Sequence, residues 1–186
     1  MDERIFVALR FAAEKHKHHR RKGGRDIPYI NHPIGVATLL ATVGGVSDPD
    51  ILAAALLHDT VEDTDTSPDE LVRLFGPEIA GLVAEVTDDP DLTSAERKLT
   101  QEREAPFKSP KAKLIRLADK TCNVYDIAHE PPPTWSDERR LAYFDWAERV
   151  VAGLRGVSAP LEAEFDARLE RGREIVTNLP RRRLGQ

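Results

Sequence analysis

Apolar residues recur along most of the chain at the spacing of an α-helix. In the first predicted helix the apolar positions lie three and four residues apart, at Ile5, Ala8, Leu9, Ala12 and Ala13. Similar patterns predict eight further helices, at 33–43, 51–63, from 67, from 77 to about 87, 94–104, 109–129, 136–154 and 158–176. No segment shows the sustained alternation that is typical of a strand. The pattern therefore predicts an all-α fold of about nine helices.

The breaks between these helices are short. A basic loop at 15–25 is closed by Gly23-Gly24, and the prolines at 131–133 read as another short loop. Gly44-Gly45 ends the second predicted helix. We therefore predict one domain over residues 1–178, followed by a disordered tail at 179–186.

Composition narrows the class of protein. The 186 residues are 40% hydrophobic and 32% charged, which is ordinary for a soluble globular protein. The net charge of −5 argues against a nucleic-acid or membrane-surface binder. The single cysteine, Cys122, excludes an internal disulfide and suits a reducing compartment. We expect a soluble cytoplasmic protein that acts on a small molecule, with no nucleic-acid or membrane partner; its oligomeric state is left open.

The clearest candidate for chemistry follows the most apolar predicted helix. At about 100° per residue, His58, Asp59, Glu62 and Asp63 fall within one arc of about 140°. Buried carboxylates are costly unless a cation accompanies them, so the pattern predicts a divalent metal. The alternative is that these groups cap the end of the helix and face water.

Two more positions could complete a metal site. His32 precedes Pro33 at a predicted helix start, where an imidazole can point into a cleft; it could instead cap that helix. Asp119 lies on the apolar side of its predicted helix. It could instead be an ion-pair partner for Arg116 or Lys120.

Together, the four candidates offer two imidazoles and two carboxylates from three helices: His32, His58, Asp59 and Asp119. Such a set suits Mn, Fe or Zn with positions left open for water and substrate. We interpret Cys122, one turn after Asp119, as a small core residue.

The basic loop adds a third element, because it concentrates positive charge just before His32. Arg21 and Lys22 are candidates for binding phosphate, whereas Lys17 and Arg25 are assigned to a solvated face. A helical metal site beside a basic loop indicates hydrolysis of a phosphate ester or anhydride.

These motifs resemble those of a known family. The pattern of His32, then His58-Asp59, then Asp119 resembles the HD-superfamily metal-dependent phosphohydrolases. The strings PYINHP, AALLHDTVEDT and LADK resemble the hydrolase domain of RelA/SpoT-type alarmone enzymes. The segment 135–147 resembles the stand-alone small alarmone hydrolases similar to the metazoan SpoT homologues, and the likeness extends from about residue 4 to 176.

The resemblance implies an HD-type helical bundle that removes the 3′-pyrophosphate of (p)ppGpp, giving GDP or GTP and pyrophosphate. It implies Mn²⁺ as the usual metal, with another divalent ion as an option. It assigns metal binding to His32, His58, Asp59 and Asp119, and handling of water and protons to Glu62 and Asp63. It assigns substrate contacts to Arg21, Lys22, Asn123, Arg139 and Tyr143.

The sequence also departs from the family. Residues 24–27 replace a shorter approach to the PYINHP string, and Thr121-Cys122 stands where the family more often has Leu followed by His or Tyr. Neither departure involves a predicted ligand. No synthetase or regulatory region follows, so we expect degradation of alarmone without synthesis. Two alternatives remain: another HD phosphohydrolase activity, such as NADPH 2′-phosphatase or nucleotidase, and a non-catalytic nucleotide-sensing module.

Overall fold

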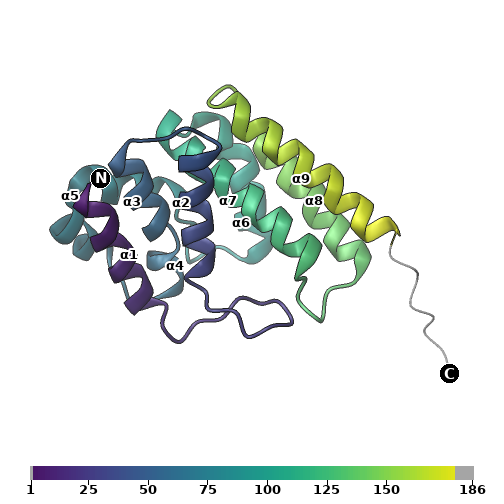
Figure 1. Cartoon of the computed structure of the whole chain (residues 1–186), viewed down its shortest axis with the longest axis horizontal. Coiled ribbons are helices and arrows are strands. Elements are labelled where there is room, and N and C mark those ends of the chain that lie inside the picture. The colour runs from purple at the N-terminus through teal and green to yellow at the C-terminus, as the bar shows by residue number, and fades with distance from the viewer. Residues whose placement is uncertain (1, 179–186) are drawn as a thin grey trace.

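The structure, a computed structural model, describes residues 2–178, and its regular elements within that part are helices joined by loops (Figure 1). Its elements are α1 (Glu3–Lys15), α2 (Asn31–Thr42), α3 (Pro49–Leu57), α4 (Thr60–Asp63), α5 (Pro68–Val86), α6 (Ser94–Glu104), the 3-10 turn η1 (Ala105–Phe107), α7 (Pro110–His129), α8 (Asp137–Ala152) and α9 (Ala159–Asn178). The prediction of an all-α fold with about nine helices is confirmed. The predicted tail at 179–186 lies outside the described residues.

Side-chain caps begin many of the helices. Thr93 and Glu96 form a reciprocal capping box at the start of α6. Ser67, Ser109 and Ser136 accept hydrogen bonds from main-chain N–H groups in the first turns of α5, α7 and α8. These polar residues mark the helix starts that the sequence indicated.

One predicted helix is wrong, because the segment 51–63 is not continuous. α3 ends at Leu57, and a turn at His58 and Asp59 separates it from α4. His58 Nδ1 lies 2.8 Å from the carbonyl oxygen of Ala55, and Thr60 Oγ1 donates to that of Leu57 at 2.7 Å. Side chains thus engage main-chain carbonyls that an unbroken helix would pair with N–H groups. The helical arc predicted for His58 to Asp63 is therefore incorrect.

The second break was predicted correctly. α5 spans the two helices expected around Gly76-Pro77, and Gly76 has a φ of 83° and a ψ of 167°. A residue with a Cβ adopts that φ only with strain, so glycine permits the kink. The helical direction changes there as the sequence indicated.

α3 lies at the centre of the fold. Its apolar residues are buried apart from the half-buried Leu52, and it packs against α1, α2, α5 and α7. α7 packs in turn against α2, α8 and α9, and α8 and α9 lie side by side at one end of the molecule (Figure 1). The buried apolar residues form a single cluster. This packing brings the start of α2, the end of α3 and the middle of α7 together.

Within residues 2–178, every helix is too short or too polar to span a lipid bilayer.

Candidate metal centre and its cavity

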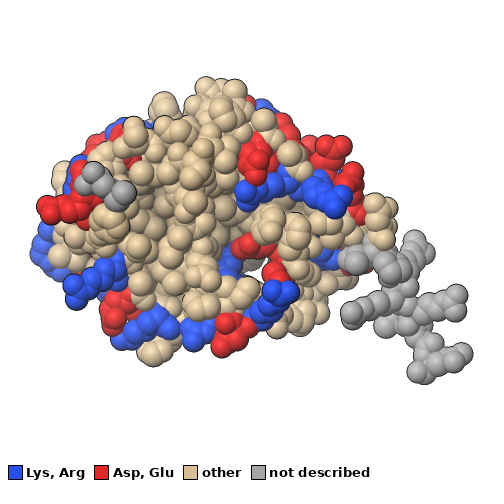
Figure 2. All heavy atoms as spheres, viewed as in Figure 1, with Lys and Arg blue, Asp and Glu red and all other residues tan. Residues whose placement is uncertain are grey.

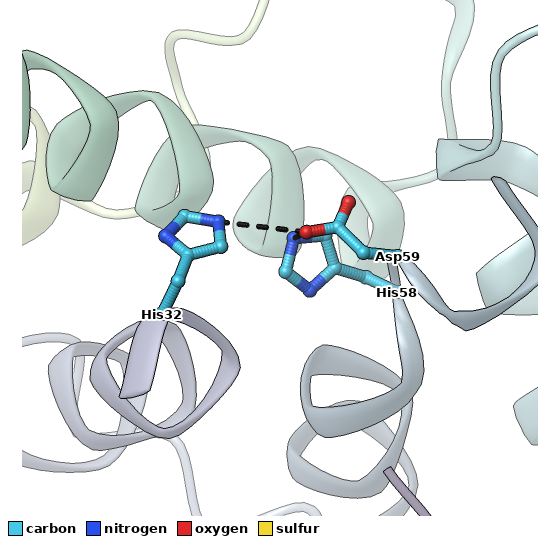
Figure 3. Close-up of side chains that lie close together, drawn as sticks. All are labelled: His32, His58 and Asp59. Carbon is cyan, nitrogen blue, oxygen red and sulfur yellow. Dashed lines mark ion pairs between the residues drawn. The ribbon is translucent and has the colours of Figure 1, made fainter. Parts of the chain in front are cut away.

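The four predicted ligands meet where α2, α3 and α7 converge. His32 Nε2 lies 3.1 Å from Asp119 Oδ1 and 3.7 Å from Asp59 Oδ2. His58 Nε2 lies 3.0 Å from Asp59 Oδ2 and 3.8 Å from Asp119 Oδ1. Figure 3 shows His32 facing the His58-Asp59 pair from a different helix. Segments that are far apart in sequence therefore present two imidazoles and two carboxylates to one point.

These distances fit a single metal ion. Atoms that surround one ion at about 2.0–2.2 Å lie roughly 3 to 4 Å from one another. The ligand atoms of His32, His58 and Asp59 lie within 4.8 Å of one another, and Asp119 Oδ1 lies within 3.8 Å of both imidazoles. His58 Nε2 is buried without a well-aligned hydrogen bond, while Nδ1 faces the carbonyl of Ala55. Such a contact orients the ring of a metal ligand.

The surroundings of these residues distinguish metal binding from helix capping and from ion pairing alone. Ile30 is the N-cap of α2 and makes no side-chain cap bond, so His32 does not cap the helix. His58 is the C-cap residue of α3, but it is 2% exposed and does not face water. Glu62 and Asp63 are exposed, so for these two carboxylates the alternative is partly right. Asp119 does pair with Lys120, at 3.1 Å, but through Oδ2; its Oδ1 faces the imidazoles and also accepts a hydrogen bond of 2.5 Å from Asn123 Nδ2. Arg116 pairs elsewhere, with Asp88.

The charges of the cluster are tightly coupled. Burial alone would lower the pKa of His58, but the neighbouring carboxylates of Asp59 and Asp119 raise it to about 10. Burial alone would raise the pKa of Asp59, but His58 and His32 hold it well below its usual range. Lys120 and the same imidazoles hold the pKa of Asp119 low against its burial. Without a metal, the cluster is therefore a protonated imidazole between two carboxylates, and a bound cation would take the place of that proton.

Tyr29 contacts the cluster but was assigned no role from the sequence. Its hydroxyl donates to Asp59 Oδ2 at 2.7 Å, and its ring stacks on the buried His16 with centroids 4.7 Å apart. Burial raises the pKa of Tyr29 far above its usual value, so it stays a hydrogen-bond donor. The sequence signals for it are its place three residues before His32 and its inclusion in the PYINHP string.

A cavity of about 1130 Å³ opens beside the cluster. Figure 2 shows a hollow there, with basic and acidic side chains around it. All five predicted substrate contacts line the cavity, and so do both predicted proton-transfer carboxylates: Arg21, Lys22, Asn123, Arg139, Tyr143, Glu62 and Asp63. His32 and Asp59 line it as well. The structure thus brings the predicted site residues to one space.

Glu62 and Asp63 lie on α4, immediately after the ligand turn. Glu62 Oε1 accepts a hydrogen bond of 2.6 Å from the main-chain N–H of Asp88. The surrounding protein raises the pKa of Glu62 to about 7, with Asp88 and Asp59 adding to the effect. A carboxyl group with a pKa near neutrality can both accept and release a proton under ordinary conditions.

Arg21 and Lys22 have different surroundings, although the sequence treated them alike. Arg21 Nη2 donates to Asp126 Oδ2 at 2.6 Å and to Asn123 Oδ1 at 2.9 Å. The Arg21 guanidinium also lies over the ring of Tyr29, 5.4 Å from its centroid. Lys22 is exposed on the cavity wall. Arg21 is therefore held inside the site, and Lys22 is the accessible charge of the pair.

The two residues assigned to a solvated face are exposed, and each forms an ion pair. Lys17 binds Glu14 at 2.6 Å, and Arg25 binds Glu130 at 3.1 Å. Cys122 is buried, and burial raises the pKa of its thiol to about 12. These environments agree with a solvated face and with a small, unreactive core residue.

Aromatic residues line the wall of the cavity near α6 and α8. The Arg139 guanidinium lies over the ring of Trp135, 4.5 Å from its centroid. Lys98 Nζ lies 5.1 Å from the ring of Trp146 and 5.8 Å from that of Tyr143. Lys98 was missed because it lies on the polar α6, where nothing in the sequence distinguishes it from a solvent-facing lysine.

The fold and the His/Asp cluster are those of an HD-domain protein, and the family model for the HD domain matches residues 8–143. The chain therefore belongs to the HD-domain family. Its His/Asp site is of the kind that binds a divalent metal.

Within this family, the chain is similar to proteins named guanosine-3′,5′-bis(diphosphate) 3′-pyrophosphohydrolase MESH1. It is 51% identical over 162 residues to the Xenopus tropicalis protein, which covers 87% of this chain and 90% of that one. It is 51% identical over 158 residues to the Homo sapiens protein, covering 85% and 88%. A solved structure described as a metazoan ortholog of SpoT that hydrolyzes ppGpp matches with a TM-score of 0.89 and 45% identity, covering 92% of this chain and 96% of that one. The chain belongs with these relatives, and the resemblance inferred from its motifs is confirmed.

Proposed function

We propose that this chain is a metal-dependent enzyme that removes the 3′-pyrophosphate of (p)ppGpp, with Mn²⁺ as its metal. The observation that carries the proposal is that one cavity joins the His/Asp cluster, two further carboxylates and several cations. Its relatives are named for this reaction. An NADPH 2′-phosphatase or a nucleotidase would use the same His/Asp cluster. An experiment must therefore identify the substrate.

In this proposal, His32, His58, Asp59 and Asp119 would hold the metal. A divalent ion supplies polarisation of the phosphoryl group and a lower pKa for water. Lys120 neutralises the second oxygen of Asp119, which leaves the first for the metal.

Glu62 and Asp63 then act on protons at the cavity wall. The oxygen of water attacks the phosphorus bonded to O3′, and the bond from that phosphorus to O3′ breaks. One carboxylate accepts the proton of the water, and a proton returns to O3′ of the departing nucleoside. The raised pKa of Glu62 suits either task. The products are GDP or GTP and pyrophosphate.

The remaining contacts bind the nucleotide. Lys22, from the loop after α1, and Arg139, from α8, line the cavity and offer charge to phosphate oxygens. Asn123 and Tyr143 offer polar and aromatic surface to the nucleoside, and Arg21 holds Asn123 in place. Of these, Lys22 has the most open charge, so it is the strongest candidate for direct phosphate contact.

Turnover of a substrate panel tests the proposal. Purified protein with Mn²⁺ is given ppGpp, pppGpp, NADPH and simple nucleotides, and pyrophosphate and orthophosphate are measured separately. We expect pyrophosphate from ppGpp and pppGpp, and slower reaction with the others. Faster release of orthophosphate from NADPH would replace the proposed activity with a phosphatase, and binding without turnover would indicate a sensor.

A further inference from the structure

The loop between α5 and α6 contacts the proposed proton-transfer machinery. The main-chain N–H of Asp88, in this loop, donates to Glu62 Oε1 at 2.6 Å. The two residues are 26 positions apart, so the contact depends on where the loop is held. It engages one carboxylate oxygen of Glu62, whose side chain lines the cavity. The position of the loop therefore affects the direction in which Glu62 points.

Two nearly buried side chains from other helices hold this loop. Gln101 Nε2, from α6, donates to Asp88 Oδ2 at 2.5 Å. Arg116 Nη2, from α7, donates to Asp88 Oδ1 at 3.3 Å and to the carbonyl oxygen of Val86. Gln101 is 9% exposed and Arg116 is 6% exposed. Burial of a guanidinium is costly unless it is paired, and both recorded partners of Arg116 lie at the end of α5 or in the loop.

The same helix carries the anchor and a proposed metal ligand. Arg116 precedes Asp119 by three residues on α7, so the two lie on neighbouring parts of one helical face. Asp119 points to the imidazole cluster, and Arg116 points to the loop that contacts Glu62. α7 is therefore one rigid element with two effects. It positions the proposed metal ligand Asp119, and through Arg116 and the loop it also orients Glu62.

We propose that Arg116 and Gln101 are positioning residues for Glu62 and act through Asp88. The inference rests on the proposed function, because it assigns to Glu62 a part in the reaction. A carboxylate that must meet a water molecule beside a metal loses effectiveness when it is displaced by about 1 Å, at a cost of roughly 100-fold in rate.

Hydrogen exchange of the Asp88 amide tests the contact in the full chain without metal or substrate. Arg116→Met and Gln101→Leu should each speed this exchange by about tenfold, because the loop loses an anchor. If Arg116→Met does not fold, exchange at Asp88 is measured in Gln101→Leu alone. Unchanged exchange in both variants would overturn the proposal.

Arg140→Met is the matched control. Arg140 is also a buried arginine that donates to main-chain carbonyls, those of Ile127 and Ala128, and it has no link to Glu62. It should lower thermal stability and leave exchange at Asp88 unchanged. Equal acceleration in the control would show a general loss of stability and would also overturn the proposal.

A double-mutant cycle tests the consequence for catalysis. With Mn²⁺ and saturating ppGpp, Arg116→Met should lower kcat by roughly 10- to 100-fold, with KM and bound metal almost unchanged. In a Glu62→Gln background the same change should alter kcat by less than about twofold, because the residue it positions is already disabled. An equal loss in both backgrounds would mean a structural role only. If the wild-type protein did not turn over ppGpp, the proposed function would be overturned. Hydrogen exchange at Asp88 would still show whether Arg116 and Gln101 hold the contact between Asp88 and Glu62.

Discussion

The buried ligand cluster and the basic loop beside it are built in different ways. His32, His58 and Asp119 are each 5% exposed or less and belong to helices or to the turn that ends one. The loop after α1 is largely exposed and carries its charges on long side chains. In the cluster, helix packing sets the position of each polar atom. In the loop, the charged side chains have unlike surroundings: Arg21 pairs with Asp126, Arg25 pairs with Glu130, and Lys22 is exposed.

This difference explains why neighbouring cations have different roles. Arg21 turns inward to Asp126 and Asn123, whereas Lys22 remains on the open wall of the cavity. Adjacent residues in an exposed loop can thus differ in role: Arg21 has structural contacts, whereas the charge of Lys22 is open to a ligand. Variants of the cluster should therefore give all-or-none effects, and variants of the loop should give graded ones.

The largest effect is expected in the cluster. His58→Ala and Asp59→Ala should each remove bound metal and activity, because each deletes a ligand from a group of four. Far-ultraviolet circular dichroism should retain most of the helical signal. Metal content measured by atomic emission decides the matter, and full metal in both variants would contradict the ligand assignment.

The next largest effect is expected from the two carboxylates proposed to transfer protons, Glu62 and Asp63. The double variant Glu62→Gln with Asp63→Asn should keep metal and substrate binding and lose turnover by about 10²-fold or more. The reason is that amides preserve the shape of the wall but accept no proton. Single-turnover kinetics together with equilibrium binding separate the two effects. Normal turnover would place proton transfer elsewhere.

The loss of kcat/KM in variants of the basic loop should depend on the surroundings of each replaced side chain. Arg21→Ala should lower kcat/KM by roughly 10- to 150-fold and also reduce Tm, because Asp126 loses its partner. Lys22→Ala should lower kcat/KM by about tenfold through KM, with no change in Tm. Lys17→Ala, on the solvated face, is the control and should do much less. Equal, small effects at all three positions would reduce the loop to general electrostatic attraction.

The smallest expected effect is the release of protons when the metal binds. Because the pKa of His58 is raised to about 10 in the metal-free cluster, this imidazole is protonated at pH 7.5 and must lose its proton to bind a metal. Metal binding at pH 7.5 should therefore release about one proton, and the release should vanish as the pH rises past 10. Calorimetry in buffers of different ionisation enthalpy measures it. Absence of release at pH 7.5 would show that the cluster binds metal differently.

Sequence reasoning succeeded where short-range rules decide the outcome. Apolar spacing indicated most helices, and the HD and LADK strings indicated residues that the structure brings together. It failed at the turn of His58 and Asp59, because side-chain bonds to Ala55 and Leu57 override the helical pattern there. The contacts of Tyr29 with Asp59 and of Asp88 with Glu62 depend on tertiary packing, which one sequence does not reveal.

Metal content and turnover, measured on the same samples, test the central claim most directly. Metal-free protein is titrated with Mn²⁺, and bound metal and the rate of pyrophosphate release from ppGpp are recorded at each step. The account predicts that the rate rises in proportion to bound metal and reaches its limit at about one ion per chain, as expected for a single four-ligand site. Full turnover in chelator-treated protein, or a rate that does not follow bound metal, would contradict it.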